Sequence, residues 1–241
     1  MIFPVKSPYT IGVDIKKHEG EVLDNYVDSE YLIQKKGELE SHRELISGTF
    51  ENGYIKYLSE YTGKSGSIEE ISLQMNEDVA ILKDGKVVEI CFSFPSGFTP
   101  THLLGKNFFE IHAPVPEGDK LRKASDNITS LISKEGGVFR RYVWSLSPLK
   151  SLSQLPAKER PEPSSISDIW FRTETQSLVG LRDGVTLFFI KVNMTPLNEV
   201  WVDLEKRTAI VDSVNSMSEQ VLNYKGLSRI KEILNETMSV F

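Results

Sequence analysis

Two stretches of the sequence each join two apolar runs through a short turn, and this pattern constrains the fold more than any other feature. In VAILKDGKVVEICFSF, residues 79–94, the runs meet at Asp84-Gly85. In residues 168–194, DIWFRTETQSLVGL and VTLFFIKVNM meet at Arg182-Asp183-Gly184. Asp-Gly pairs tolerate the positive φ that hairpin turns need, so each stretch predicts two antiparallel strands. With a further strand at VFRRYVWSL, residues 138–146, we expect an antiparallel sheet of about five strands.

Helical patterns flank this sheet on both sides in the sequence. We expect helices within residues 28–45, 52–63, 119–137 and 216–238, from apolar spacing and from cap residues such as Asp28. Residues 145–167 are rich in serine, proline and charge, which indicates a surface loop. The sequence therefore predicts an α+β domain spanning residues 1–241. Its parts are a helical N-terminal extension (1–70), a sheet-containing core (71–195) and C-terminal helices (196–241).

Composition narrows the function. The net charge of −6 provides no basic field for phosphates, so we expect no nucleic-acid partner. No apolar run reaches the ~18 residues that span a bilayer, and the first residues lack the apolar core of a signal peptide. The single cysteine, Cys91, excludes an internal disulfide and a four-cysteine cluster, and it fits the reducing cytoplasm. Histidine, carboxylates or tyrosine must hold any metal here.

One of only four histidines lies in a constrained apolar segment, GKNFFEIHAPVPEG, residues 105–118. Asn107 can cap a helical turn, and Phe108, Ile111 and His112 then share one face. The two prolines that follow force extended backbone and end the turn near His112. Two interpretations remain open: a core histidine bonded to a backbone carbonyl, or an axial ligand to a flat apolar cofactor such as haem. His102 is the rival ligand.

Polar residues also alternate along one predicted strand. Arg172, Glu174 and Gln176 share a face because side chains two apart point the same way. They form either a solvated surface row or a polar stripe on an inner face. Similarly, Arg140 and Arg141 alternate, so one of them should point inward as a weak candidate for binding a carboxylate. Glu77 and Asp78, which open a strand, are either solvated turn residues or functional ones.

Several of these segments, in order along the chain, resemble the family of haem-dependent oxidative N-demethylase, in its haem-binding α subunit, a PAS-like domain. The longest matching run is QMNEDVAILKDGKVVEICFSFPSGFTPTHLLGKNFFEIHAPVPEG, residues 74–118. The segments YTIGVDI, DSEYLIQKKGELESHREL, VWSL and FRTETQSLVGLRDGVTLFFIK match other parts of the family. The resemblance implies a PAS-like fold for the core.

The resemblance also implies a function and a set of roles. It implies haem b bound through His112, with Phe108, Ile111, Trp144 and Arg172 around it. Glu174 and Gln176 become the candidate catalytic residues. If the stripe lies on an inner face, it suggests two alternative roles for Glu174, accepting a proton from a cationic amine or binding that amine, and for Arg172 the neutralisation of a propionate. The implied reaction is O2-dependent demethylation of a small methylated amine such as dimethylamine. Electrons would come from NADPH through reductase subunits of a hetero-oligomer that carry FMN and an iron–sulfur cluster.

The chain departs from the family at three positions, Val143, Thr175 and Lys191, where we expect an asparagine and two arginines, and it is shorter than typical members. The departures raise the question of whether haem is retained. Two alternative functions therefore stand beside the enzyme. One is a haem PAS gas or redox sensor without turnover, and the other is a scaffold homologue that has lost haem.

Overall fold

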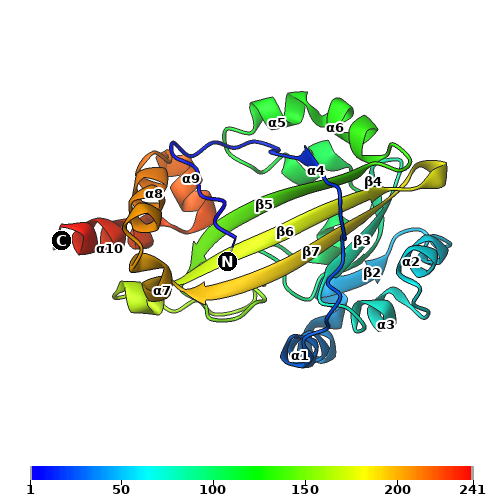
Figure 1. Cartoon of the computed structure of the whole chain (residues 1–241), viewed down its shortest axis with the longest axis horizontal. Helices are drawn as coiled ribbons and strands as arrows, with labels where there is room; N and C mark the ends of the chain where they lie inside the picture. Colours follow the sequence, from blue (N-terminus) through cyan, green and yellow to red (C-terminus); the bar gives the residue numbers. More distant parts are fainter. Residues whose placement is uncertain (1, 240–241) are drawn as a thin grey trace.

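The computed structural model describes residues 2–239 as a mixed α+β protein built on one antiparallel sheet (Figure 1). Within these residues seven strands lie in the order β1-β5-β6-β7-β3-β4-β2. The strands are β1 (Lys16–Lys17), β2 (Ser47–Thr49), β3 (Asp78–Lys83), β4 (Lys86–Cys91), β5 (Val138–Ser147), β6 (Trp170–Gly180) and β7 (Val185–Pro196). The helices are α1 (Ser29–Ile46), α2 (Ile55–Thr62), α3 (Ile68–Ser72), α4 (Phe108–His112), α5 (Asp119–Lys123), α6 (Ser125–Ile132), α7 (Leu197–Trp201), α8 (Leu204–Asn215), α9 (Glu219–Lys225) and α10 (Ser228–Met238).

Both predicted hairpins are confirmed. Strands β3 and β4 pair antiparallel across Asp84 and Gly85, which both have positive φ. Strands β6 and β7 pair across Asp183 and Gly184, which also have positive φ. The α+β class is therefore confirmed. The sheet exceeds the expected five strands because two short edge strands, β1 and β2, extend it, and both come from the region predicted to be a helical extension.

The helices cover the sheet in separate groups. Figure 1 shows α4, α5 and α6 together on one side of the sheet, away from α1, α2 and α3, and α8, α9 and α10 gathered at one end of the long strands. A large apolar cluster joins α7–α10 to the ends of β5 and β6. Among the described residues no helix has the length and apolar character to cross a membrane.

Capping residues explain where several helices begin. Asp28 accepts hydrogen bonds from the backbone of Glu30 and Tyr31 at the start of α1, as predicted. Asn107 and Glu110 form a capping box that opens α4. The single helix expected over residues 119–137 is instead two helices, α5 and α6, which meet at Ala124.

Candidate cofactor site

A mostly apolar cavity of about 210 Å3 lies between the sheet and the α4–α6 group. Its walls come from all five long strands, β3 to β7, on the sheet side and from α4 and α6 on the other, with further residues from the segments 13–15 and 92–103. Apolar side chains from the sheet include Ala80, Leu82, Ile90, Leu178, Phe188 and Ile190, and Phe92 follows directly after β4. Few polar groups interrupt this lining, which is typical of sites for flat apolar ligands.

His112 faces this cavity from the last turn of α4, together with Phe108 and Ile111. The Nδ1 atom of His112 lies 2.8 Å from the carbonyl oxygen of Phe108. Because a carbonyl only accepts, Nδ1 must carry the proton, and the lone pair of the neutral ring is then on Nε2. Among residues 2–239, Nε2 has no hydrogen-bond partner.

The surroundings of His112 keep the ring neutral and fixed. Burial lowers the pKa of His112, and the nearby charge of Arg141 lowers it further. The hydrogen bond to the Phe108 carbonyl acts in the opposite direction but does not outweigh them. The ring also packs on the Phe108 ring, with centroids 4.0 Å apart. A neutral, oriented imidazole with a free Nε2 is the state that binds iron. Both interpretations of His112 drawn from the sequence agree with this geometry, because the carbonyl bond leaves the second nitrogen available.

His102, the rival ligand, does not share the cavity. It is exposed in a 3-10 turn, Pro100–Leu103, and its neighbour Leu103 lines the cavity instead.

The polar stripe on β6 lies on the cavity side of the sheet and is buried. Arg172 is 1% exposed and Glu174 is 7% exposed, so a solvated surface row is wrong. Arg172 forms an ion pair with Glu174, and Gln176 donates a hydrogen bond to the other oxygen of that carboxylate. Burial alone would raise the pKa of Glu174, but the charge and hydrogen bond of Arg172 and the bond from Gln176 hold it below its usual range. Glu174 is therefore ionised at neutral pH.

Of this stripe, only Glu174 and Gln176 line the cavity. The guanidinium of Arg172 lies deeper and donates to the Phe94 carbonyl at 2.8 Å and to the Ser96 hydroxyl at 3.3 Å. Arg172 is thus committed to protein partners. Its position favours a role in holding Glu174 over the predicted contact with a propionate.

The cavity has its own cation, Arg141, which sequence reasoning rated only as a weak candidate. Arg141 lines the cavity, whereas Arg140 points to the other face of the sheet. The guanidinium of Arg141 has no hydrogen-bond partner within residues 2–239. Burial lowers the pKa of Arg141, although the charge of Glu174 opposes this. The alternation of β5 showed that one of the two arginines points inward, but only the pairing of the strands shows which one.

From the sequence, Glu77 and Asp78 are either solvated turn residues or functional residues. The structure excludes the first alternative, because both side chains are buried. They are 3% and 1% exposed. Asp78 lines the cavity and forms an ion pair with Lys35 of α1, which is fully buried. The ammonium of Lys35 also donates to the carbonyls of Ser72, Met75 and Glu77. The sequence does not indicate that Lys35 is buried and makes these contacts, because its charged neighbours are typical of a solvated helix.

Trp144 does not line the cavity. It stacks on Phe171, with ring centroids 6.0 Å apart, within the apolar cluster that holds the C-terminal helices. Two of the three departures from the family, Thr175 and Lys191, also lie on the opposite face of the sheet and line a different cavity. They leave the polar groups around His112 untouched. Val143 pairs in register with Glu174 on the neighbouring strand.

The donor set fits haem better than it fits a bare metal ion. Among residues 2–239, no three His, Cys, Asp or Glu side chains come together where they could hold a metal ion. A porphyrin brings four nitrogen ligands, so one imidazole on an apolar wall suffices. The volume of the cavity fits haem less well than its donor set does, because sites for cofactor-sized ligands usually enclose about 300–1,000 Å3. The cavity of about 210 Å3 lies below this range, so a porphyrin would need more room than these walls enclose.

These features define a class of protein: an α+β chain whose sheet face and helical cover enclose an apolar cavity with one free imidazole nitrogen. The chain belongs to the family described as haem-dependent oxidative N-demethylase, alpha subunit-like, which matches residues 35–235. The family's description names haem dependence, oxidative N-demethylation and an alpha subunit. No curated protein matches the chain.

Proposed function

We propose that this chain is a haem-binding subunit of an oxidative N-demethylase that acts on a small methylated amine such as dimethylamine, and that its sheet is PAS-like. The observation that carries this is His112, which lines an apolar cavity while its Nδ1 is held by a carbonyl, and whose Nε2 has no hydrogen-bond partner among residues 2–239. Family membership supports haem and N-demethylation as the chemistry. Haem b bound there supplies O2 activation.

Each cavity residue has a role in this proposal. His112 would hold the iron of the haem, and Phe108 and Ile111 would contribute apolar wall to the site. Arg141 takes the role of propionate partner from Arg172, because its guanidinium is unpaired and lines the cavity. Trp144 keeps a structural role in the C-terminal core.

The substrate end of the proposal rests on Glu174. Its carboxylate is ionised, buried and directed into the cavity, so it can bind an ammonium ion in a water-poor site. Gln176 orients one oxygen of that carboxylate, and Arg172 holds the other. The lowered pKa makes the Glu174 carboxylate a weak base, which favours binding the cationic amine over accepting its proton.

Electrons reach the site from partner subunits in this proposal. The chain has one cysteine, Cys91, which is fully buried, so an iron–sulfur cluster must be held by another chain. We propose that NADPH is oxidised by reductase subunits that carry FMN and the cluster, in a cytoplasmic hetero-oligomer.

One observation favours a second candidate, a family member that serves as a scaffold without haem. The cavity of about 210 Å3 is smaller than is usual for cofactor sites. A sensor without turnover keeps the haem and differs only in lacking an amine reaction.

Absorption spectra after haem titration test the proposal. We expect a Soret band in the wild type, a shift of that band on adding dimethylamine, and formaldehyde release with a reductant and O2. His112→Ala should lose the Soret band, while the exposed control His102→Ala should keep it. Haem binding that survives His112→Ala unchanged contradicts the assigned ligand. No Soret band in the wild type supports the scaffold, and a band without formaldehyde supports the sensor.

A further inference from the structure

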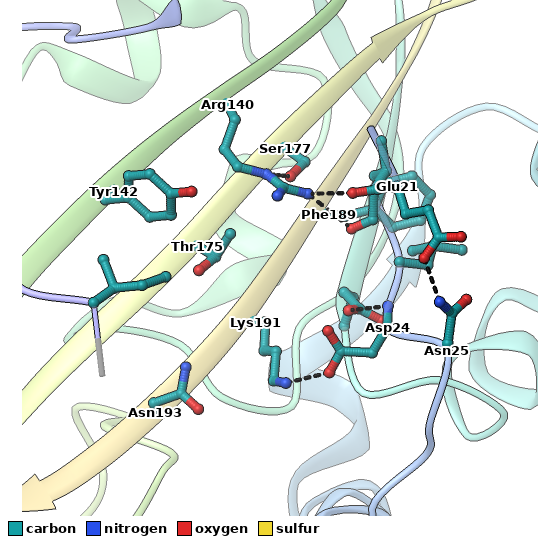
Figure 2. Close-up of a pocket in the computed structure, with 14 residues that line it drawn as sticks. Glu21, Asp24, Asn25, Arg140, Tyr142, Thr175, Ser177, Phe189, Lys191 and Asn193 are labelled. Carbon is teal, nitrogen blue, oxygen red and sulfur yellow. Dashed lines mark hydrogen bonds and ion pairs between the residues drawn. The ribbon is translucent and has the colours of Figure 1, made fainter. Parts of the chain in front are cut away.

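A second cavity, of about 390 Å3, lies on the opposite face of the sheet. One wall is formed by β5, β6 and β7, and the other by residues 21–25 of the N-terminal segment (Figure 2). Its volume is within the range usual for small-molecule sites. In contrast to the His112 cavity, its polar side chains are numerous: Glu21, Asp24, Arg140, Tyr142, Thr175 and Asn193, with others beside them.

The sheet places the polar groups of one wall on a regular grid. Tyr142 of β5 is in register with Thr175 of β6, and Thr175 is in register with Lys191 of β7. Side chains directly opposite on neighbouring strands lie about 5 Å apart. Figure 2 shows these three side chains on adjacent strands, with Asn193 next along β7 on the same face. The wall therefore presents a two-dimensional array of hydrogen-bonding groups.

Three charged side chains of this cavity already have partners: Lys191, Asp24 and Arg140. Lys191 forms an ion pair with Asp24 across the cavity. Arg140 donates to the Ser177 hydroxyl at 3.0 Å and to the backbone carbonyls of Glu21 and Val22 at 2.9 and 3.2 Å. A charged ligand would have to compete with these contacts, whereas a neutral ligand leaves them in place. The electrostatics thus favour a ligand without net charge.

The uncharged groups have hydrogen-bonding capacity to spare. Among residues 2–239, the hydroxyls of Tyr142 and Thr175 and the amide of Asn193 have no hydrogen-bond partner. Each of these groups can both donate and accept. Glu77, which also lines the cavity and is 3% exposed, has an Oε2 without a partner, while its Oε1 accepts from the backbone of Asp24. A buried acceptor left unpaired is costly, so it points to a donor supplied from outside the chain.

We propose that this cavity binds a small, neutral, polyhydroxylated molecule of the monosaccharide or polyol class. Several hydroxyls on one compact frame match the mixture of unpaired donors and acceptors, because each hydroxyl serves in either role. The ring of Tyr142, which is half exposed, offers an apolar face beside the array. This site is separate from the His112 cavity and does not depend on haem.

Calorimetric and NMR titrations of the full chain test this proposal. The probes are D-glucose, D-mannose and myo-inositol, with acetate and ammonium as charged comparisons. Melting temperatures are avoided, because sugars stabilise proteins by exclusion from the surface. Tyr142→Phe and Thr175→Val each remove one hydroxyl, and Tyr26→Phe removes a hydroxyl from an exposed tyrosine outside the cavity as the matched control.

We expect saturable binding of at least one sugar or polyol, weakened about tenfold in the Tyr142→Phe, Thr175→Val double variant and unchanged in Tyr26→Phe. Three results would overturn the proposal. They are no saturable binding of any neutral probe, equal affinity in the double variant and the wild type, or tighter binding of acetate or ammonium than of the sugars.

Discussion

The two cavities share one sheet but differ in chemistry. The His112 cavity has apolar walls, and within residues 2–239 one imidazole nitrogen and the guanidinium of Arg141 have no hydrogen-bond partner. The cavity on the other face has many polar groups, and its lysine and arginine are already bonded to protein atoms. Residues adjacent in sequence line different cavities: Arg141 and Glu174 line the His112 cavity, whereas Arg140 and Thr175 line the second one. Alternation along a strand thus lets one sheet support two environments, and a single substitution can address one face without the other.

The largest stability effect is expected for Arg172→Met. This change leaves the Glu174 carboxylate buried without its cation, and removing one partner of such a pair costs about 3–5 kcal/mol. Urea unfolding would measure the loss. The double variant Arg172→Met, Glu174→Leu should recover most of it, because no charge is then left buried. Equal losses in the single and double variants would show that packing, and not the ion pair, dominates.

The loss of stability caused by Glu174→Gln should be largest at neutral pH. The folded pKa of Glu174 is lowered, so its ionised form contributes stability above the unfolded pKa of about 4.3, and this is lost as pH falls through the folded pKa. The stability gap between wild type and variant should therefore shrink by up to about 1.4 kcal/mol per pH unit on acidification. A gap that stays constant from neutral pH to about pH 3 contradicts the lowered pKa.

Glu77, which lines the second cavity, should behave in the opposite way. Burial raises the pKa of Glu77, and the charge of Asp24 raises it further. Hydrogen bonds from the backbone and the charge of Lys35 lower it, but by less. A raised folded pKa means stability that is present below the unfolded pKa and lost as pH rises through the folded one. Glu77→Gln keeps an acceptor for the backbone N–H of Asp24 but cannot ionise. The free energy of unfolding of this variant should therefore rise relative to that of the wild type as pH rises from about 4 to about 7. Chemical denaturation at several pH values measures this slope, and a slope of the opposite sign would contradict the assignment.

The smallest effect is expected for Lys191→Gln. Its ion pair with Asp24 is partly exposed, so its loss should cost about 0–1 kcal/mol. Because Lys191 faces away from His112, the haem titration should be unchanged. A weakened Soret band in this variant would show that the two faces are coupled and that the family departure at Lys191 affects haem.

Much of the fold could be predicted from local signals. Asp84-Gly85 and Asp183-Gly184 specify turns through backbone conformations that few residues tolerate, so both hairpins followed from the sequence. Asp28 and Asn107 mark helix starts for an equally local reason. The edge strands β1 and β2 escaped prediction because two or three residues carry no periodic pattern, and pairing with β5 and β4 alone makes them strands.

The candidate site was only partly predictable. The placement of His112 in the last turn of a capped helix, with Phe108 one turn before it, is local and was evident. The burial of Arg172 and Glu174 as an ion pair was not, since spacing of two residues occurs equally on solvated and buried faces. Lys35 shows the limit most clearly: its sequence neighbours are charged, yet it is buried against residues about forty positions away.

The sequence by itself determined the turns, the caps and the alternation of the strands, because these depend on the backbone preferences of a few adjacent residues. Only the tertiary structure decided which face of each strand meets the helices. That choice assigned Arg141 to the His112 cavity, Trp144 to the C-terminal core, and Thr175 and Lys191 to the second cavity. The physical reason is that burial and ion pairing depend on contacts between distant segments, which local patterns do not encode.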